Sequence, residues 1–276
     1  MWSNRLHEVK SFFGHLRHAR GPHGVHSPFV YQLITDVLRN KMRGPKHEAI
    51  EHRRASLRSV SAVLSVTDFG AGSRVHRQME RKVGDIARVA LQPASHARAL
   101  SLLAQHAKSK NILELGTSLG ITTAHLADSV SDSKIFTLEG SEEIAELAKE
   151  TWSELGLHSI ESITGPFSET LDGVLQRMPS VDFVIIDGDH RGEACLEYLN
   201  QIFPHTSENS VIVLDDIYWS PSMTSAWEQC VADTRFTLSL DFFDFGVLYR
   251  TGGRVKEHFR LARPWLKSHQ PFFNAI

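Results

Sequence analysis

Short, almost continuous apolar runs recur from residue 111 onward, and each is followed by a segment whose apolar residues lie three or four positions apart. Runs of the first kind are typical of strands buried on both faces, and the second pattern is typical of helices that cover a sheet. Helices are predicted to begin near residues 121, 141 and 193. The predicted strands are 111–115, 135–138, 159–163, 181–187 and 210–214. This alternation predicts an α/β fold with a parallel central sheet.

The pattern changes near the end of the chain. Residues 236–240 and 245–249 form two more strand-like runs, and the link between them is only a few residues long. So short a link requires an antiparallel hairpin, because a parallel pair needs a long crossover connection. The tail after Thr251 is basic and contains aromatic residues, which predicts that it packs back on the body. These aromatics are Phe259, Trp265 and Phe272.

The first 92 residues have a different character. Residues 1–58 are expected to be helical, with Ser27 and Pro28 starting a helix that extends to about residue 39. In residues 59–92, a strand and a glycine turn are expected to lead into a basic helix from Arg74 to Ala90, which together act as a connector or lid. A further helix is predicted at 93–108. We therefore expect a helical N-terminal extension or lid at 1–92, followed by the main domain at 93–276.

Composition and charge narrow the class of protein. The chain has 276 residues, of which 41% are hydrophobic and 22% charged, and its two cysteines form neither a disulfide framework nor a zinc site. No apolar run is long enough to span a membrane and the N-terminus lacks a secretory pattern, so a cytoplasmic location is expected.

The charge is unevenly distributed along the chain. Residues 1–90 carry 16 Lys and Arg against 7 Asp and Glu, whereas the remainder is acidic. The basic segment is expected to pack against the acidic body or to face an anionic partner. Four histidines in this segment lack a carboxylate or cysteine framework for a metal, so structural or surface roles are expected. They are His15, His18, His23 and His26.

Residues 111–139 contain the first candidate for a ligand-binding site. A strand leads into the glycine turn 116–120, and a second strand ends in Glu139. Glycines allow a sharp turn and a close approach of a ligand to the main chain, and an acid after the second strand is suited to bind a ribose diol. The spacing G-x-x-x-G differs from the G-x-G-x-x-G of dinucleotide-binding folds. With Glu114, the motif E-L-G-T-S-L-G resembles motif I of class I S-adenosylmethionine-dependent methyltransferases.

This resemblance implies a Rossmann-like class I methyltransferase fold: a mostly parallel seven-stranded sheet with a C-terminal antiparallel hairpin, preceded by the N-terminal helical extension. It also implies a site for S-adenosylmethionine, in which Gly165 and Phe167 line the adenine. The family often has an acid where this chain has Pro166. The cofactor-binding residues implied are Glu114, Gly116, Ser118, Gly120, Glu139, Gly165, Phe167 and Asp187.

Three carboxylates follow the last two parallel strands: Asp187, Asp215 and Asp216. Ligands bind at this edge of an open α/β sheet, and a cluster of carboxylates favours a hard cation such as Mg²⁺. The same acids could instead bind the cofactor or cap helices without a metal. The set resembles the metal-dependent catechol and caffeoyl-CoA O-methyltransferases, in which the position of Asp216 is an asparagine. Those enzymes have a lysine base at the position of His190.

The resemblance implies that His190 and Asp187 are catalytic, with His190 as the general base, and that Asp187, Asp215 and Asp216 bind a divalent metal. The expected function is O-methylation of a small hydroxylated molecule with metal assistance and without a membrane partner. One alternative is an RNA or protein methyltransferase that docks through the basic N-terminal segment. Another is a non-catalytic module that binds the cofactor. The sequence leaves the acceptor's identity and the oligomeric state open, including a homo-oligomer.

Overall fold

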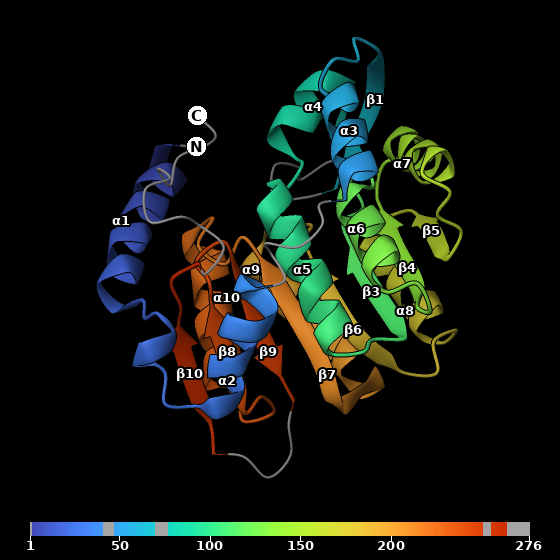
Figure 1. The fold of residues 1–276 in the computed structure, drawn as a ribbon. Coiled ribbons are helices and arrows are strands. Elements are labelled where there is room, and N and C mark those ends of the chain that lie inside the picture. Colours follow the sequence, from blue (N-terminus) through green and yellow to red (C-terminus); the bar gives the residue numbers. More distant parts are fainter. Residues whose placement is uncertain (1, 41–46, 70–76, 251–254, 264–276) are drawn as a thin grey trace.

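An eight-stranded sheet forms the centre of the computed structural model, which describes residues 2–40, 47–69, 77–250 and 255–263 (Figure 1). Across the sheet, the strands are ordered β10-β8-β9-β7-β6-β3-β4-β5, and β9 is antiparallel to both of its neighbours. The strands are β3 (Asn111–Leu115), β4 (Lys134–Glu139), β5 (Ile160–Thr164), β6 (Val181–Ile186), β7 (Thr206–Asp215), β8 (Leu238–Asp241), β9 (Phe245–Tyr249) and β10 (Glu257–Arg260). The predicted fold class is confirmed.

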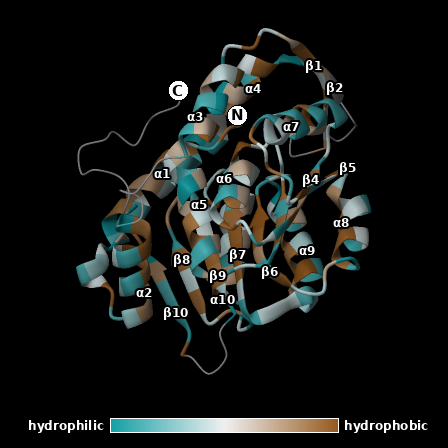
Figure 2. Ribbon diagram, turned by 45° about the vertical axis from the view of Figure 1, so that its right-hand side comes forward, coloured by the Kyte–Doolittle hydropathy of each residue, from teal (hydrophilic) through white to brown (hydrophobic). Residues whose placement is uncertain are grey.

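Both faces of the central strands are buried, as their apolar runs predict. In β6, Val184 and Ile186 belong to a first apolar cluster, whereas Phe183 and Ile185 belong to a second cluster on the opposite face. This alternation follows from the two-residue period of a strand. Figure 2 shows hydrophobic residues along the central strands between the covering helices.

The helices divide between these two faces. The first cluster is completed by α8 (Phe167–Leu175), α9 (Gly192–Ile202) and α10 (Pro221–Ala232). The second is completed by residues of α2 (Pro28–Gln32), the π-helical turn η2 (Leu33–Arg39), α5 (Ala94–His106) and α6 (Ile121–Ser129). A short helix η4 (Phe203–His205) precedes β7. No helix within the described ranges is long and apolar enough to cross a bilayer.

The N-terminal 92 residues are only partly helical. Besides α1 (Trp2–His18), η1 (Pro22–Gly24) and α3 (Glu48–Leu57), they contain the antiparallel hairpin β1 (Val63–Asp68) and β2 (Arg77–Lys82). The expected basic helix from Arg74 is therefore wrong over 77–82, and helix α4 covers only Val83–Val89. The charged sequence of β2 favours a helix locally, but pairing with the alternating apolar residues of β1 overrides that preference. The glycine turn at 70–73 lies outside the described residues.

The hairpin β1–β2 and helices α3 and α4 pack against α6 and α7 (Glu142–Glu154). Val66, Val83 and Ile86 share a third apolar cluster with Ile144 and Trp152. The N-terminal extension is thereby joined to the part of the sheet that carries the glycine turn.

At the other end of the chain, the predicted hairpin of β8 and β9 is confirmed. The count of seven strands is wrong, because β10 adds an eighth, parallel to β8. Phe259 in β10 is partly buried against the second apolar cluster, as the packing of the tail predicted. Trp265 and Phe272 lie outside the described residues.

Candidate active site at the carboxyl edge of the sheet

The glycine turn lies directly against the end of β6. The Asp187 amide donates a hydrogen bond to the Leu115 carbonyl at 2.8 Å. Gly116 has φ 104°, and a Cβ there would lie 1.9 Å from the carbonyl oxygen of Asp187. Only glycine suits both this backbone conformation and this approach. The turn and the first of the predicted acids therefore form one continuous surface.

Glu139, at the end of β4, is held against the same turn. Its carboxylate accepts hydrogen bonds from the amides of Ser118 at 2.9 Å and Ser141 at 3.0 Å. Burial raises the pKa of Glu139, and these amides act in the opposite direction. Gly120, with φ 76°, begins α6, and its carbonyl accepts from the Trp152 indole at 2.8 Å. Ser118, Gly120 and Glu139 thus meet at one point of the sheet edge.

Glu114 lies beneath the turn, in the interior. Its side chain is buried, and Oε2 accepts hydrogen bonds from the hydroxyls of Thr123 and Thr137, both at 2.6 Å. Burial raises the pKa of Glu114 to about 7, although both hydroxyls favour the charged form. The carboxyl group therefore joins β3, β4 and α6 inside the protein, and its predicted contact with a cofactor stays a prediction.

The loop after β5 reaches the same region. The Gly165 amide donates to the Glu139 carbonyl at 2.9 Å. The ring of Phe167 lies so close to Gly188 that a Cβ there would be 2.7 Å from it, and the ring also meets Tyr198 edge-on at 5.8 Å. Phe167 therefore borders both the apolar core and the segment that follows Asp187.

Asp187 and Asp215 form an acidic pair that Gln92 bridges. The Gln92 amide donates to Asp187 Oδ2 at 3.2 Å and also to Asp215 Oδ2. The pKa of Asp187 is raised well above its usual value by burial and then by the charge of Asp215. The pKa of Asp215 is also raised well above its usual value, by burial and then by the charge of Asp216. Two carboxyl groups so close together favour a shared proton.

The environment of this pair includes groups that the sequence did not single out. The carbonyl of Gln92 accepts a hydrogen bond from the Arg54 guanidinium. His96 Nε2 lies 3.2 Å from Asp215 Oδ1, and burial lowers the pKa of His96. Gln92 precedes α5 directly, in a stretch that predicts only the start of a helix. No spacing in the sequence connects it with acids about a hundred positions away.

Asp216 lies beside His190, and its charge raises the pKa of both Asp187 and Asp215. Its φ is 52°, and its amide donates to the Asp244 carbonyl at 2.8 Å. Oδ2 of Asp216 lies 3.8 Å from His190 Nε2, and the two side chains are 39% and 30% exposed. The His190 ring is 6.1 Å from that of Trp219, which is also exposed. An acceptor molecule can reach these three side chains from solvent.

The segment that carries His190 is fixed by its neighbour Asp189. Arg191 donates to both carboxylate oxygens of Asp189, at 2.6 and 2.5 Å, and the Tyr198 hydroxyl donates at 3.2 Å. Asp189 has φ 51°, which turns the chain sharply after β6. This turn sets the direction in which His190 leaves the sheet.

The predicted metal centre is not confirmed by this arrangement. Among the described residues, no group of three or more His, Cys, Asp or Glu side chains is placed to hold a metal ion. The Gln92 amide donates to Asp187 and Asp215, and Asp216 lies beside His190. The assignment of the three acids as metal ligands stays a prediction.

Two parts of the N-terminal extension border this edge of the sheet. The Ser65 amide of β1 donates to Glu143 at 2.6 Å, and the ring of Phe69 packs on Gly140, next to Glu139. On α1, burial raises the pKa of Glu8, and the charge of Asp216 raises it further. The extension therefore approaches both the glycine turn and the acids.

The fold and this edge define an α/β protein with a candidate site where its parallel strands end, and comparisons with known proteins show what it is similar to. Residues 113–217 match the family model described as a methyltransferase domain. This part of the chain therefore resembles a methyltransferase domain, and the predicted resemblance to class I methyltransferases is confirmed. No curated protein matches the sequence.

Solved structures show the same fold. An O-methyltransferase from Bacillus cereus, in complex with S-adenosylhomocysteine, is 20% identical with a TM-score of 0.57, over 80% of this chain and 97% of the other. A Podospora anserina methyltransferase, also bound to S-adenosylhomocysteine, is 17% identical with a TM-score of 0.58, over 82% and 97%. The O-methyltransferase TomG from Streptomyces achromogenes, which is involved in tomaymycin synthesis and was solved with S-adenosylmethionine, is 21% identical with a TM-score of 0.52, over 59% and 82%.

Proposed function

We propose that the protein is an S-adenosylmethionine-dependent O-methyltransferase that acts on a small hydroxylated molecule. The observation that carries this proposal is the contact between the glycine turn and the acidic pair, where Gly116 lies against the backbone of Asp187. A cofactor on the turn and an acceptor near the acids would therefore share one edge of the sheet. The complexes of the Bacillus and Streptomyces O-methyltransferases with this cofactor or its product support the choice.

The residues of the turn fit the cofactor's polar groups. Each oxygen of Glu139 accepts one backbone amide, which leaves further lone pairs for the two hydroxyls of a ribose. Gly116 and Gly120 place little side-chain bulk on the turn, so a ligand can approach the main chain. When bound, S-adenosylmethionine supplies an electrophilic methyl group on a cationic sulfur, which the nearby carboxylates favour.

His190 is placed to act as the general base. It lies beside Asp187 in sequence and is partly exposed, so an acceptor hydroxyl can reach its ring. The ring nitrogen would take the hydroxyl proton, and Asp216 at 3.8 Å would stabilise the resulting imidazolium. The exposed ring of Trp219 offers an apolar surface on which an aromatic acceptor could pack.

The acidic pair has a separate task in this proposal. Because burial favours a neutral form of Asp187 or Asp215, the pair can both donate and accept a hydrogen bond. A second hydroxyl on the acceptor would be oriented by these oxygens, with Gln92 holding them in place.

The basic N-terminal segment gives no support to a nucleic-acid or protein acceptor. Arg53 is paired with Glu154 of the main domain at 2.9 Å, and Arg54 is paired with Glu51 inside the segment at 3.0 Å. The Arg53–Glu154 pair agrees with the packing explanation of the charge asymmetry.

The experiment that tests this function compares the His190→Gln variant with the unaltered protein. Transfer of a labelled methyl group from S-adenosylmethionine to a panel of phenols and vicinal diols is measured, in Mg²⁺ and in EDTA. Loss of the base should lower kcat at least 100-fold and leave S-adenosylhomocysteine affinity unchanged. The control is His52→Gln, which changes an exposed histidine of α3.

Three results would contradict parts of the proposal. Unchanged turnover in His190→Gln would remove the base assignment. Loss of activity in EDTA, restored by Mg²⁺, would show that a metal does participate. Labelling of RNA or protein, with no labelling of any small acceptor, would establish the alternative function instead.

A further inference from the structure

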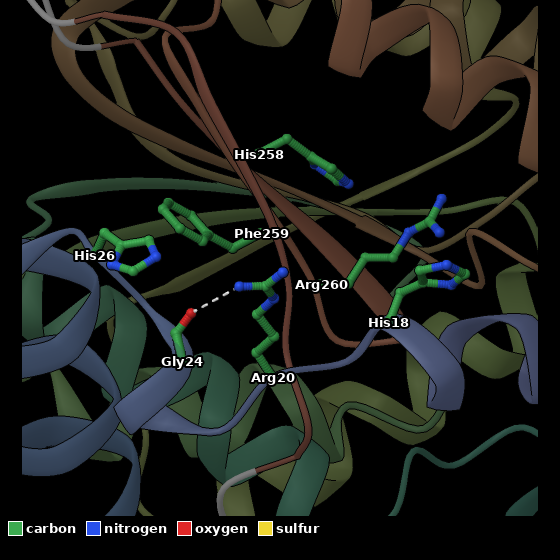
Figure 3. Close-up of a pocket in the computed structure, with 7 residues that line it drawn as sticks. All are labelled: His18, Arg20, Gly24, His26, His258, Phe259 and Arg260. Carbon is green, nitrogen blue, oxygen red and sulfur yellow. Dashed lines mark hydrogen bonds between the residues drawn. The ribbon is translucent and has the colours of Figure 1, made fainter.

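A second concave site lies outside the edge strand of the sheet, and it involves none of the residues assigned to methyl transfer. Its cavity has a volume of about 330 Å³. Figure 3 shows that one wall comes from the segment after α1 and the other from β10. The lining residues are His18, Arg20, Gly24, His26, His258, Phe259 and Arg260.

The lining contains two arginines, three histidines and no carboxylate. The two guanidinium charges raise the electrostatic energy of the protein unless an anion or a nearby acid offsets them.

The nearest acid offsets this charge only in part. The fully buried Asp241 lies 3.6 Å from Arg260 Nε, outside hydrogen-bond distance. Its carboxylate already accepts the Tyr218 hydroxyl at 2.6 Å and the Phe243 amide at 2.9 Å, and His15 lies 3.2 Å away. The Arg260 guanidinium, 37% exposed, therefore keeps donors for a further acceptor.

The backbone fixes the two arginines side by side. The Arg20 amide donates to the Arg260 carbonyl at 2.9 Å, and the Ala262 amide donates to the Arg20 carbonyl at 3.1 Å. The Arg20 side chain makes one long hydrogen bond, to the Gly24 carbonyl at 3.4 Å. Two planar guanidinium groups are thus carried by hydrogen-bonded neighbouring segments, which lowers the entropy lost when both bind one ligand.

The histidines add donors around them. Nδ1 of His18 donates to the Gly14 carbonyl at 2.9 Å, which orients its ring at the edge of the pocket. His26 is exposed at the rim of the cavity. Arginine forks and imidazole N–H groups together suit an anion with several oxygens.

We propose that this pocket binds a phosphate group. Its volume is at the small end of ligand pockets, which favours a compact anion over an extended strand. The phosphate could belong to a free phosphate compound or to a lipid headgroup. The second source has local support, because α1 ends at the pocket and exposes Leu6, Phe13 and Leu16, which are 58%, 59% and 42% exposed.

The first test is a calorimetric titration of the full chain with inorganic phosphate at constant ionic strength. Saturable binding is expected, with Kd raised about tenfold by Arg20→Gln and also raised by His26→Gln. The matched control is Arg17→Gln, which removes an exposed arginine of α1 that does not line the pocket. No saturable binding, or equal weakening in the control, would overturn the proposal.

A second arm identifies the source of the phosphate. Vesicles of phosphatidylglycerol and phosphatidylcholine in equal parts are sedimented with the protein. Co-sedimentation that Arg20→Gln and Phe13→Ser both abolish would assign a lipid headgroup. Phosphate binding without co-sedimentation would assign a free phosphate compound. If an RNA oligonucleotide were the only anion whose binding depended on Arg20, the pocket would not be a compact phosphate site.

Discussion

Glu114 allows a direct test of how burial controls the chemistry beneath the glycine turn. The proposed change is Glu114→Gln, which keeps the shape of the side chain and an oxygen that can accept the hydroxyls of Thr123 and Thr137. Glutamine has no carboxyl proton to lose. The variant therefore removes one titration from the folded protein and leaves the surrounding groups in place.

The size of the effect follows from the pKa of Glu114, which burial raises from 4.5 to about 7. Each pKa unit corresponds to about 1.4 kcal/mol, so burying the charged form costs roughly 3 kcal/mol. Because the pKa of Glu114 is raised in the folded protein, the neutral acid makes its full contribution to the free energy of unfolding below about pH 4.5. It is lost as the pH rises through about 7. As the pH rises from 5 to 8, the free energy of unfolding of the variant should increase by about 2–3 kcal/mol relative to that of the unaltered protein.

The assay is urea denaturation of both proteins at several pH values between 5 and 8. Other groups with a raised pKa, such as Asp187, titrate alike in the two proteins. Their contributions therefore cancel in the difference between the two free energies of unfolding. The control is Glu146→Gln, which changes an exposed glutamate of α7 and should show a difference that does not vary with pH. The reasoning would be refuted if the difference in unfolding free energy between Glu114→Gln and the unaltered protein did not change with pH. It would also be refuted if the variant were less stable than the unaltered protein at pH 8.

Two further substitutions test the site. Gly116→Ala should destabilise the protein by about 3 kcal/mol or more in thermal unfolding, because its Cβ would overlap the carbonyl of Asp187 at positive φ. The control Gly173→Ala has open space around the new Cβ and should be tolerated. Equal destabilisation by the two substitutions would contradict the account. Gln92→Leu should lower the free energy of unfolding by about 1–3 kcal/mol and should also lower kcat, because the acidic pair loses its shared hydrogen-bond donor. Gln176→Leu, which breaks a surface amide–carboxylate bond, should change neither quantity; no difference between the two variants would count against a positioning role for Gln92.

The parts of the fold that the sequence predicts are those governed by periodicity and turn chemistry. The apolar runs predict β3, β4, β6 and β7, because strands buried on both faces need nearly every position to be apolar. The glycine turn is predictable for a similar reason, since positive φ at Gly116 and Gly120 leaves few residue types that fit.

The missed elements depend on partners distant in sequence. Strand β2 consists largely of charged residues that favour a helix, and its state is set by pairing with β1. Strand β10 is only four residues long and is recognisable through its neighbour β8.

The same limit applies to the candidate site. The carboxyl ends of successive strands predict the acids, but they do not predict that Asp216 lies beside His190. The bridge from Gln92 spans residues that no sequence pattern connects. Periodicity places residues at an edge, whereas hydrogen-bond partners within that edge follow from the packing of whole elements.

The central claim is that the glycine turn and Glu139 bind S-adenosylmethionine, and its most direct test is a calorimetric titration with S-adenosylhomocysteine. The account predicts saturable one-to-one binding to the unaltered protein. Binding should weaken at least about tenfold in Glu139→Gln, because the amide presents a weaker acceptor to the ribose hydroxyls. Glu143→Gln, on the first turn of the next helix, should bind like the unaltered protein. No binding to the unaltered protein, or identical affinity in Glu139→Gln, would contradict the assignment of this site.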